Sequence, residues 1–367
     1  MKVISEKNPR IIFDREEIFS DNEKKKRSGH LGNAMVELND GSIIAFYPNV
    51  SHTLPSVYPG HSMYGWMEYR RSYDRGITWS DPEILKYSWD EFLEGYYKIG
   101  VEKAVVTDDG TIVLLCLRSV SPTSFEPYTN PTSIRSTDGG KTWSEAVEVG
   151  PLAGRIYDAL YRDGRIYALE YCNSTDEGFY GTPKAKEVEP DLSYKIYASD
   201  DNGATFYEYS TIPFDTMDHG YGNLIFREDG SLVFYAHNFV DEQNLTCYIS
   251  SDDGKTWEGP IKSPTVKGSR NPQVGFINGR YILHCRGLKM RDFVFYHSED
   301  GINWDEGTIV SGLGRDGKPI SGCYYSNNLV VRGDDGVDRM LIQYSEQFVP
   351  NTGKFNIKHA WLECSWE

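Results

Sequence analysis

The side chains of this 367-residue chain that could carry out chemistry are histidines, tyrosines, arginines and acids that recur beside apolar, β-rich runs. Histidine titrates nearest neutrality and is the most frequent general acid or base, and arginine can contact a carboxylate. Such a set could transfer protons and bind an anionic group. The candidates are, in chain order, His30, Asn33, Asn49, His52 and His61; Glu102, Lys103 and Arg118; Arg155, Tyr157, Asp158, Glu170 and Tyr171; Asp218, His219, Tyr221, Asn223 and His237; Arg270, Asn271, Gln273, Arg286 and Arg291; and Cys323, Tyr324, Tyr325, Asn327, Tyr344 and Glu346.

The elements that must position these groups are predicted by a repeated unit of two apolar strands joined by a tight turn. An Asn-Gly or Asp-Gly pair between such runs is the strongest short-range hairpin signal. Six hairpins indicate six blades with little helix, and residues 11–13 and 359–364 are expected to supply the outer and third strands of the last blade. The turns are Asn39-Asp40-Gly41, Asp109-Gly110, Asp163-Gly164, Asp229-Gly230, Asn278-Gly279 and Asp335-Gly336.

A second repeat, a variant of Ser-x-Asp-x-Gly-x-Thr-Trp, occurs five times at intervals of about 50 to 65 residues, which is about the size of one propeller blade. Asp and Gly favour a tight turn in which the carboxylate accepts backbone N–H bonds. The aromatic residue is expected to be largely buried between neighbouring blades. The copies begin at Ser72, Ser136, Ser199, Ser250 and Ser298, and the last one is a residue shorter.

This repeat is the Asp-box pattern, and the chain resembles the sialidase superfamily. The resemblance implies an all-β fold, a single six-bladed β-propeller over residues 1–367. It also implies that the boxes lie on the turns between third and fourth strands, far from the active site. Substrates of such propellers sit at the start of the inner strands, at one mouth of the central channel, where the listed side chains are expected. A rim so rich in titratable and aromatic groups fits a polar ligand of the size of a sugar.

Part of the family's catalytic pattern is present in the last blade. The family's Tyr-Ser-x-Leu sequence reads here as Tyr325-Ser326-Asn-Asn-Leu329, which makes Tyr325 the expected nucleophile and Tyr324 the alternative if the alignment slips by one residue. The third of the family's three arginines, which clamp the substrate carboxylate, matches Arg291.

The remaining catalytic positions depart from the family. Where the first arginine is expected the chain has His30, and where the acid/base Asp is expected there is no acid before Glu68. Tyr221 stands where the family has the Glu that activates the tyrosine, and His237 stands where it has the second arginine. Histidines have thus replaced acids and arginines around a retained tyrosine, with His61 in the loop before the first box.

The leading interpretation is an exo-glycosidase that acts on a terminal, anionic sugar. The alternatives are a polysaccharide or oligosaccharide lyase with a His/Tyr pair, and a non-catalytic glycan-binding propeller. A paired-carboxylate mechanism through Glu102, Asp158 or Glu170 is a variant of the first interpretation. The expected catalytic residues are Tyr325, His61 (as proton donor), Tyr324 and His237. The expected substrate contacts are Arg291, Arg270, Arg286, His30, Asn33, Glu102, Arg118, Asp158, Tyr221, His219 and Gln273.

The composition of the chain argues against several classes of binding partner. The formal net charge of −16 argues against nucleic acid and against an anionic membrane surface. Six cysteines without C-x-x-C spacing suit reduced core thiols, and the histidines lack zinc-site spacing, so neither a metal nor a cofactor is expected. The first residues contain no apolar segment, which predicts a cytoplasmic protein unless a leader has been removed.

Overall fold

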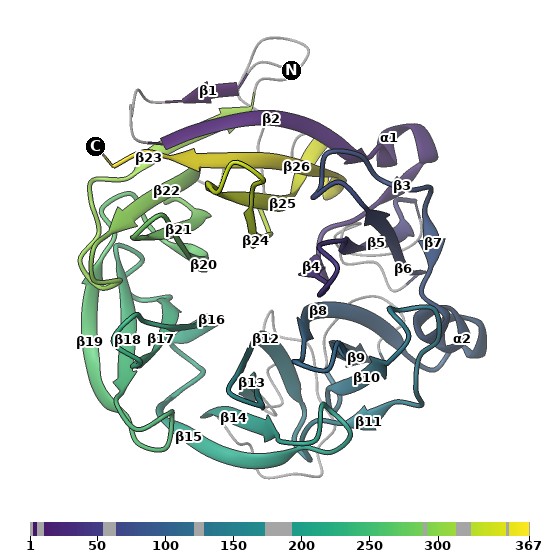
Figure 1. Cartoon of the computed structure of the whole chain (residues 1–367), viewed down its shortest axis with the longest axis horizontal. Coiled ribbons are helices and arrows are strands. Elements are labelled where there is room, and N and C mark those ends of the chain that lie inside the picture. The colour runs from purple at the N-terminus through teal and green to yellow at the C-terminus, as the bar shows by residue number, and fades with distance from the viewer. Residues whose placement is uncertain are drawn as a thin grey trace. The chain divides into compact units, whose positions relative to one another are not determined.

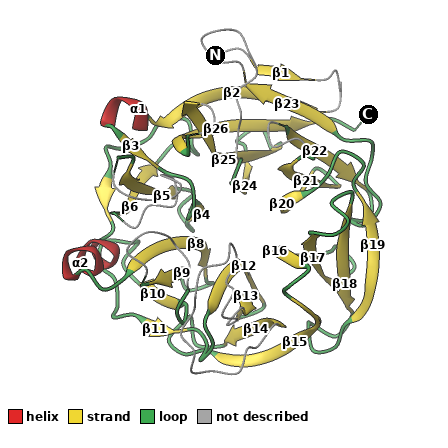
Figure 2. Cartoon of the chain, turned by 180° about the vertical axis from the view of Figure 1, so that it is seen from behind, coloured by secondary structure: helices red, strands yellow, loops and turns green. Residues whose placement is uncertain are grey.

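The computed structural model describes residues 3–5, 11–53, 64–120, 128–172, 193–288, 292–312, 324–349 and 352–366. Strands dominate these ranges, and the two short helices in them are α1 (Asn22–Lys25) and α2 (Lys86–Glu94), drawn red in Figure 2. Neither helix has the length and apolar character that a membrane crossing requires.

The chain folds into two compact units, each with three antiparallel sheets that we call blades A to F in chain order (Figure 1). Unit 2 comprises residues 31–217 and 254–257. Its strands are β4 (Ala34–Glu37), β5 (Ile43–Ser51), β6 (Gly65–Ser72) and β7 (Glu83–Ile84) in blade A; β8 (Lys98–Val106), β9 (Ile112–Ser119), β10 (Thr132–Ser136) and β11 (Val147–Glu148) in blade B; and β12 (Gly154–Arg162), β13 (Arg165–Cys172), β14 (Ser193–Ser199) and β15 (Tyr207–Asp215) in blade C.

Unit 1 comprises residues 1–30, 218–253 and 258–367, and includes the short strand β3 (Arg27–Ser28). Its blades are β16 (His219–Phe226), β17 (Leu232–Asn238), β18 (Asn244–Ser250) and β19 (Glu258–Pro264) in blade D; β20 (Arg270–Ile277), β21 (Arg280–Arg286), β22 (Phe293–Ser298), β23 (Thr308–Gly312) and β1 (Val3–Ser5) in blade E; and β24 (Ser326–Arg332), β25 (Asp338–Val349), β26 (Lys354–Cys364) and β2 (Ile11–Ser20) in blade F.

All six predicted turns join the first two strands of their blades, so the hairpin prediction is confirmed. The turn glycines adopt the left-handed backbone conformation, for example Gly41 and Gly110 with φ of 80° and 84°. Only glycine enters this region without a steric cost, which is why the Asn-Gly and Asp-Gly pairs predict the hairpins well.

Blade F is completed by the N-terminal strand, as predicted: β2 pairs antiparallel with β26, with Phe13 opposite Leu362. A buried ion network secures this strand. The Nζ of Lys358 donates to Oε1 of Glu16 at 2.7 Å and also contacts Glu346. Burial, only partly offset by the charge of Lys358, raises the pKa of Glu346 to about 7.

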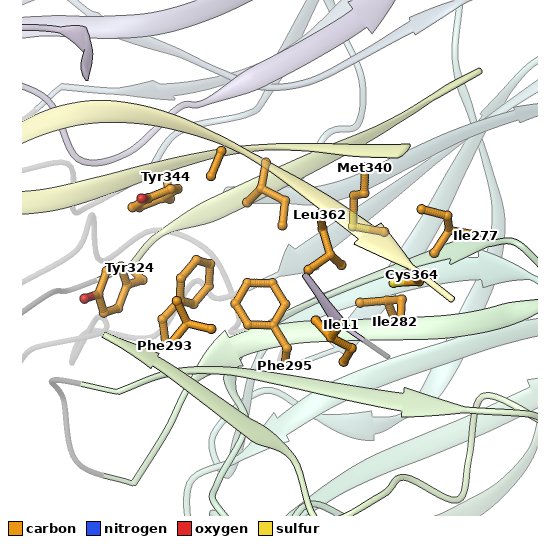
Figure 3. Close-up of a cluster of buried hydrophobic side chains, with 13 residues drawn as sticks. Ile11, Ile277, Ile282, Phe293, Phe295, Tyr324, Met340, Tyr344, Leu362 and Cys364 are labelled. Carbon is orange, nitrogen blue, oxygen red and sulfur yellow. The ribbon is translucent and has the colours of Figure 1, made fainter. Parts of the chain in front are cut away.

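The core of unit 1 between blades E and F is an aromatic and aliphatic layer (Figure 3). Tyr324 stacks on Phe293 with ring centroids 4.7 Å apart and planes 10° apart, and Tyr344 packs beside both rings. Tyr324 is only 1% exposed. The side chain that directly precedes Tyr325 is therefore part of the hydrophobic core.

The Asp-box at Ser136 has the predicted turn geometry. The Asp138 carboxylate accepts the N–H of Thr142 at 2.9 Å and its hydroxyl at 2.6 Å, and the Ser136 hydroxyl donates to the same carboxylate at 2.8 Å. These bonds hold the pKa of Asp138 well below its usual range. Arg71 of blade A donates to the carbonyl oxygens of Gly139 and Gly140, which fastens the box to the preceding blade.

The shortened fifth box keeps the same arrangement with a different donor. Asp300 accepts the backbone N–H groups of Ile302 and Asn303 at 2.8 Å each, and the Asn303 side-chain amide donates to its other oxygen at 2.7 Å. The amide of Asn303 thus replaces the threonine hydroxyl of the longer boxes. The carbonyl of Gly301 accepts the Tyr235 hydroxyl at 2.7 Å, so this box too is tied to the blade before it.

The box tryptophans pack between blades with most of their surface buried, as expected. Trp143 meets Phe46 of the preceding blade edge to face, with centroids 6.2 Å apart, and borders the core between blades A and B. Its other side remains at the surface because the box is a turn. The sequence pattern therefore predicted the burial between blades, whereas Phe46 as the partner was not predicted.

We expect Trp143→Ala to lower the free energy of unfolding by about 2 kcal/mol, less than the roughly 3–5 kcal/mol of a fully buried aromatic truncation. Urea unfolding of the purified variant measures this directly. Tyr73→Ala is the matched control: Tyr73 belongs to the first box but is 78% exposed, so its loss should change stability by no more than about 0.5 kcal/mol. Equal effects of the two changes would contradict the packing role of Trp143.

Candidate functional site

The inner strands of four blades share a local irregularity where the candidate residues stand. The pairing register shifts between Val101 and Lys103 in β8, and between Ile156 and Asp158 in β12. It shifts again in β16 and β20 of unit 1, around Tyr221 and Asn271. Such β-bulges re-aim a side chain and are frequent next to active sites.

In unit 1 these bulges bring six of the sequence-predicted residues together. We call them the tyrosine–arginine cluster. Its members are His30, Tyr221, His237, Arg270, Arg286 and Tyr325.

Two tyrosine hydroxyls meet in this cluster. The Oη atoms of Tyr221 and Tyr325 lie 3.1 Å apart, within hydrogen-bonding distance. Tyr221 is 3% exposed, and its backbone adopts φ of 55°, a conformation that bulky residues rarely take. Such strain persists only where the surrounding structure enforces it, and it concentrates at functional sites. Tyr325 precedes β24 and is half-buried, so part of its side chain reaches the surface.

Two arginines stand next to the tyrosines, on neighbouring strands. Arg270 and Arg286 are direct cross-strand partners in β20 and β21. The guanidinium of Arg286 lies 4.7 Å from the ring centroid of Tyr325, and those of Arg286 and Arg270 lie 6.0 and 5.7 Å from that of Tyr221. Arg286 is 4% exposed and donates to Oδ1 of Asn271.

This charge changes the acidity of Tyr221. Burial acts to raise the pKa of its phenol, but the positive charges of Arg286 and Arg270, together with the hydrogen bond to Tyr325, lower it below its ordinary value of 10. The arrangement therefore favours a phenolate at the Tyr221 position more than ordinary protein surroundings do.

His30 supports the opposite side of Tyr325. Its ring meets that of Tyr325 edge to face at 4.2 Å and stacks on Phe355 at 4.0 Å. Its Nδ1 lies 2.9 Å from the Ser345 hydroxyl, and the backbone N–H of Ser345 donates to the carbonyl of Tyr325 at 3.0 Å. Ser345 and Phe355 were not predicted from the sequence. Strand alternation next to Tyr344 and Glu346, which face the core side, is the signal that could have identified Ser345.

His237 is neutral at physiological pH. Burial and then the charges of Arg270 and Arg286 lower its pKa to about 3. The 3.8 Å approach of Glu242 to its Nε2 is therefore a contact with a neutral imidazole and not an ion pair. A neutral ring next to the tyrosines can accept or donate a hydrogen bond without adding to the positive charge of the arginines.

A separate group in unit 2 joins blades B and C by buried ion pairs. Arg155 donates to Oε2 of Glu102 at 2.8 Å, and Nζ of Lys103 lies 3.0 Å from Oδ1 of Asp158. Glu170 is fully buried, and a Cβ atom at Gly154 would come within 2.4 Å of its Oε1. Glu102 and Asp158, two of the proposed carboxylates, are thus each engaged by a cation.

The remaining residues that were predicted from the sequence make other contacts. Tyr324 is in the hydrophobic core. Arg118 pairs with Glu148 at 3.0 Å, and Nε2 of His219 lies 3.0 Å from the Thr246 hydroxyl. Gln273 is half-buried, and its amide donates to the adjacent backbone carbonyl; Asn33 is 7% exposed in unit 2. His61, Arg291 and Cys323 lie outside the described residues.

Comparison with known proteins agrees with the fold. Residues 134–145 match the BNR/Asp-box repeat. A sialidase of Clostridium perfringens is 26% identical over 247 residues, which cover 59% of this chain and 62% of the relative. The chain thus spans less than two thirds of that relative's length.

Solved structures extend the likeness to nearly the whole chain. A protein of unknown function from Dyadobacter fermentans superposes with a TM-score of 0.72 at 15% identity, over 98% of this chain and 100% of that one. The Hadza microbial sialidase Hz136 superposes with a TM-score of 0.66 at 17% identity, over 94% of this chain and 68% of that one. With the six blades and the box geometry, these likenesses confirm the predicted fold class: the chain is a six-bladed β-propeller of the sialidase type that carries the Asp-box repeat.

Proposed function

We propose that the protein is an exo-glycosidase that hydrolyses a terminal, carboxylate-bearing sugar of the sialic acid class. The observation that carries this proposal is the pair Arg270 and Arg286, which are direct cross-strand partners and lie close to the rings of Tyr221 and Tyr325, whose hydroxyls are within hydrogen-bonding distance of each other. Anion recognition and a nucleophile would thereby be combined in one cluster.

The arginine pair favours an anionic ligand for an electrostatic reason. Like charges directly opposite each other on an antiparallel pair are destabilising, and Arg286 is also withdrawn from water. A carboxylate placed between two guanidinium groups relieves this repulsion and accepts charge-assisted hydrogen bonds, which are stronger than neutral ones. A phenolate at Tyr221 and a substrate carboxylate together would balance the two positive charges.

Tyr325 is the proposed nucleophile. Its oxygen would bond to the anomeric carbon as the bond to the leaving group breaks, and water would then release the sugar and free the tyrosine. The local match to the sialidase pattern supports this role, as does the half-burial of Tyr325, which leaves it accessible next to the arginines. His61 remains the proposed proton donor to the leaving group.

Changing Tyr325 to Phe should reduce turnover of an aryl sialoside by about 100-fold or more, because the change removes the nucleophilic oxygen and keeps the ring. Circular dichroism and the urea midpoint should remain those of the parent protein. Tyr281→Phe is the matched control: Tyr281 is a buried tyrosine of the same unit whose hydroxyl accepts the N–H of Glu228, and its loss should leave turnover unchanged.

The products of the same assay separate the rival functions. Hydrolysis gives a reducing sugar without new ultraviolet absorbance, whereas elimination from a uronate-containing glycan leaves an unsaturated product that absorbs. Full turnover by Tyr325→Phe would exclude Tyr325 as nucleophile. Sugar binding without turnover in the parent protein would contradict the glycosidase proposal.

Arg270→Met should raise KM for a sialoside by about 10- to 100-fold, in line with the roughly 1.5–3 kcal/mol of a hydrogen bond to a charged group. A sialoside whose carboxyl has been reduced to an alcohol should bind the parent protein and the variant about equally, because the carboxylate is what Arg270 contacts. The urea midpoint of Arg270→Met should not fall, since the change removes repulsion with Arg286. A KM increase of the same size for both substrates would contradict carboxylate recognition.

A further inference from the structure

We infer that Tyr221 is a second catalytic residue, the base that takes the proton of Tyr325 when Tyr325 attacks the sugar. The inference rests on the proposed function, because it explains how the proposed nucleophile becomes reactive. The position is the one where the resemblance to sialidases would place a glutamate, so a phenol would here replace a carboxylate.

A tyrosine nucleophile needs a base because a phenol is a weak acid. A tyrosine with an ordinary pKa of about 10 is almost entirely protonated at neutral pH and is then a poor nucleophile. A positioned general base typically accelerates such a step by about 10²- to 10⁴-fold. The base must lie within hydrogen-bonding distance of the proton that it removes.

Tyr221 meets the geometric requirement. Its Oη lies 3.1 Å from that of Tyr325, and the bulge in β16 with its left-handed backbone holds the ring in this direction. Its ring packs against those of Phe239 and His237, with ring centroids 6.1 and 6.0 Å apart. A residue this buried and this constrained presents its hydroxyl to Tyr325 in one orientation.

Charge supports the same role. Among the described residues, the groups that face Tyr221 include Arg270, Arg286, the neutral His237 and the hydroxyl of Tyr325. The two cations stabilise negative charge on the Tyr221 oxygen, and the pKa of this phenol is accordingly lowered despite its burial. Arg286 also lies over the Tyr325 ring, so it can stabilise the charge that passes between the two oxygens.

The step balances without any group beyond the substrate and water. The O–H bond of Tyr325 breaks and its proton goes to the Tyr221 phenolate, while the Tyr325 oxygen bonds to the anomeric carbon and the leaving oxygen departs with its electron pair. With an aryl leaving group, a phenolate departs and needs no proton. Water then attacks the anomeric carbon, Tyr221 returns its proton to the Tyr325 oxygen, and the surplus proton of the water goes to solvent.

The test is the pH profile of kcat/KM for an aryl sialoside. Since the phenolate of Tyr221 is the active form, the rate of the parent protein should rise with pH through the pKa of Tyr221. Tyr221→Phe should lower kcat/KM at neutral pH by about 100-fold or more and move the rising limb to higher pH, where Tyr325 ionises unaided. Fluorotyrosine at position 221, which keeps the shape of the ring and acidifies its hydroxyl, should move the rising limb to lower pH.

If Tyr221 has only a structural role, these experiments should give a different result. In that case the fluorotyrosine protein would keep the parent's pH profile, and Tyr221→Phe would lower the rate without moving the limb. Either outcome would overturn the inference. The ultraviolet difference spectrum supplies a readout without turnover: one tyrosine of the parent protein should ionise below its ordinary range, and this signal should vanish in Tyr221→Phe and persist in Tyr281→Phe.

Failure of the base role is distinguishable from failure of the proposed function. If the parent protein hydrolyses no carboxylate-bearing glycoside, the glycosidase proposal falls, whatever the spectrum shows. If the parent is active and Tyr221→Phe matches it in rate and pH profile, the glycosidase proposal stands and the base role falls. Loss of the early tyrosine ionisation in Arg270→Met would further support the electrostatic cause, and its persistence there would count against that cause.

Discussion

Arg270 and Arg286 are direct partners across one antiparallel strand pair. Their mutual repulsion is the constraint that the surrounding residues of the tyrosine–arginine cluster must satisfy. Sheets usually avoid like charges at directly opposed positions because the pairing loses stability. Here the cost is reduced by the aromatic faces of Tyr221 and Tyr325 and by Oδ1 of Asn271. An anionic ligand would explain why the two like charges stand opposite each other, because its negative charge would neutralise part of theirs.

The blades supply the rigidity that such an arrangement needs. The Asp-boxes close the outer turns and fasten successive blades, as the Arg71 and Tyr235 bonds to box carbonyls illustrate. The inner strands are then free to bulge, and the bulges turn Tyr221 and Asn271 into strained positions with φ of 55°. The boxes and the bulges thus lie on different strands: the boxes follow the third strands of their blades, and the bulges lie in the inner strands. A regular frame of this kind can hold strained residues in place.

Much of this architecture was predictable from the sequence because it depends on local rules. The turn glycines need a left-handed backbone, the box aspartates need backbone N–H donors, and the pairing of residues 11–13 with the last blade follows from closing the repeat. The candidate list also contained every member of the tyrosine–arginine cluster. The burial of the box tryptophans between blades was predicted as well, although their partners, such as Phe46 for Trp143, were not.

The pairing of Tyr221 with Tyr325 could not be predicted, because these residues lie 104 positions apart and their meeting depends on a bulge. The choice between Tyr324 and Tyr325 was likewise open, since neighbouring residues of an extended segment point to opposite sides. In the structure Tyr324 stacks on Phe293 in the core, and the Tyr325 ring lies next to Arg286, which favours Tyr325 as the proposed nucleophile.

We propose that the opposed arginines hold a sugar carboxylate next to Tyr325, and a crystal structure of the protein with bound sialic acid would test this arrangement. The sugar carboxylate is expected within hydrogen-bonding distance of both guanidinium groups, with the anomeric carbon facing the Tyr325 oxygen. A sugar bound elsewhere, or one whose carboxylate points away from Arg270 and Arg286, would contradict it.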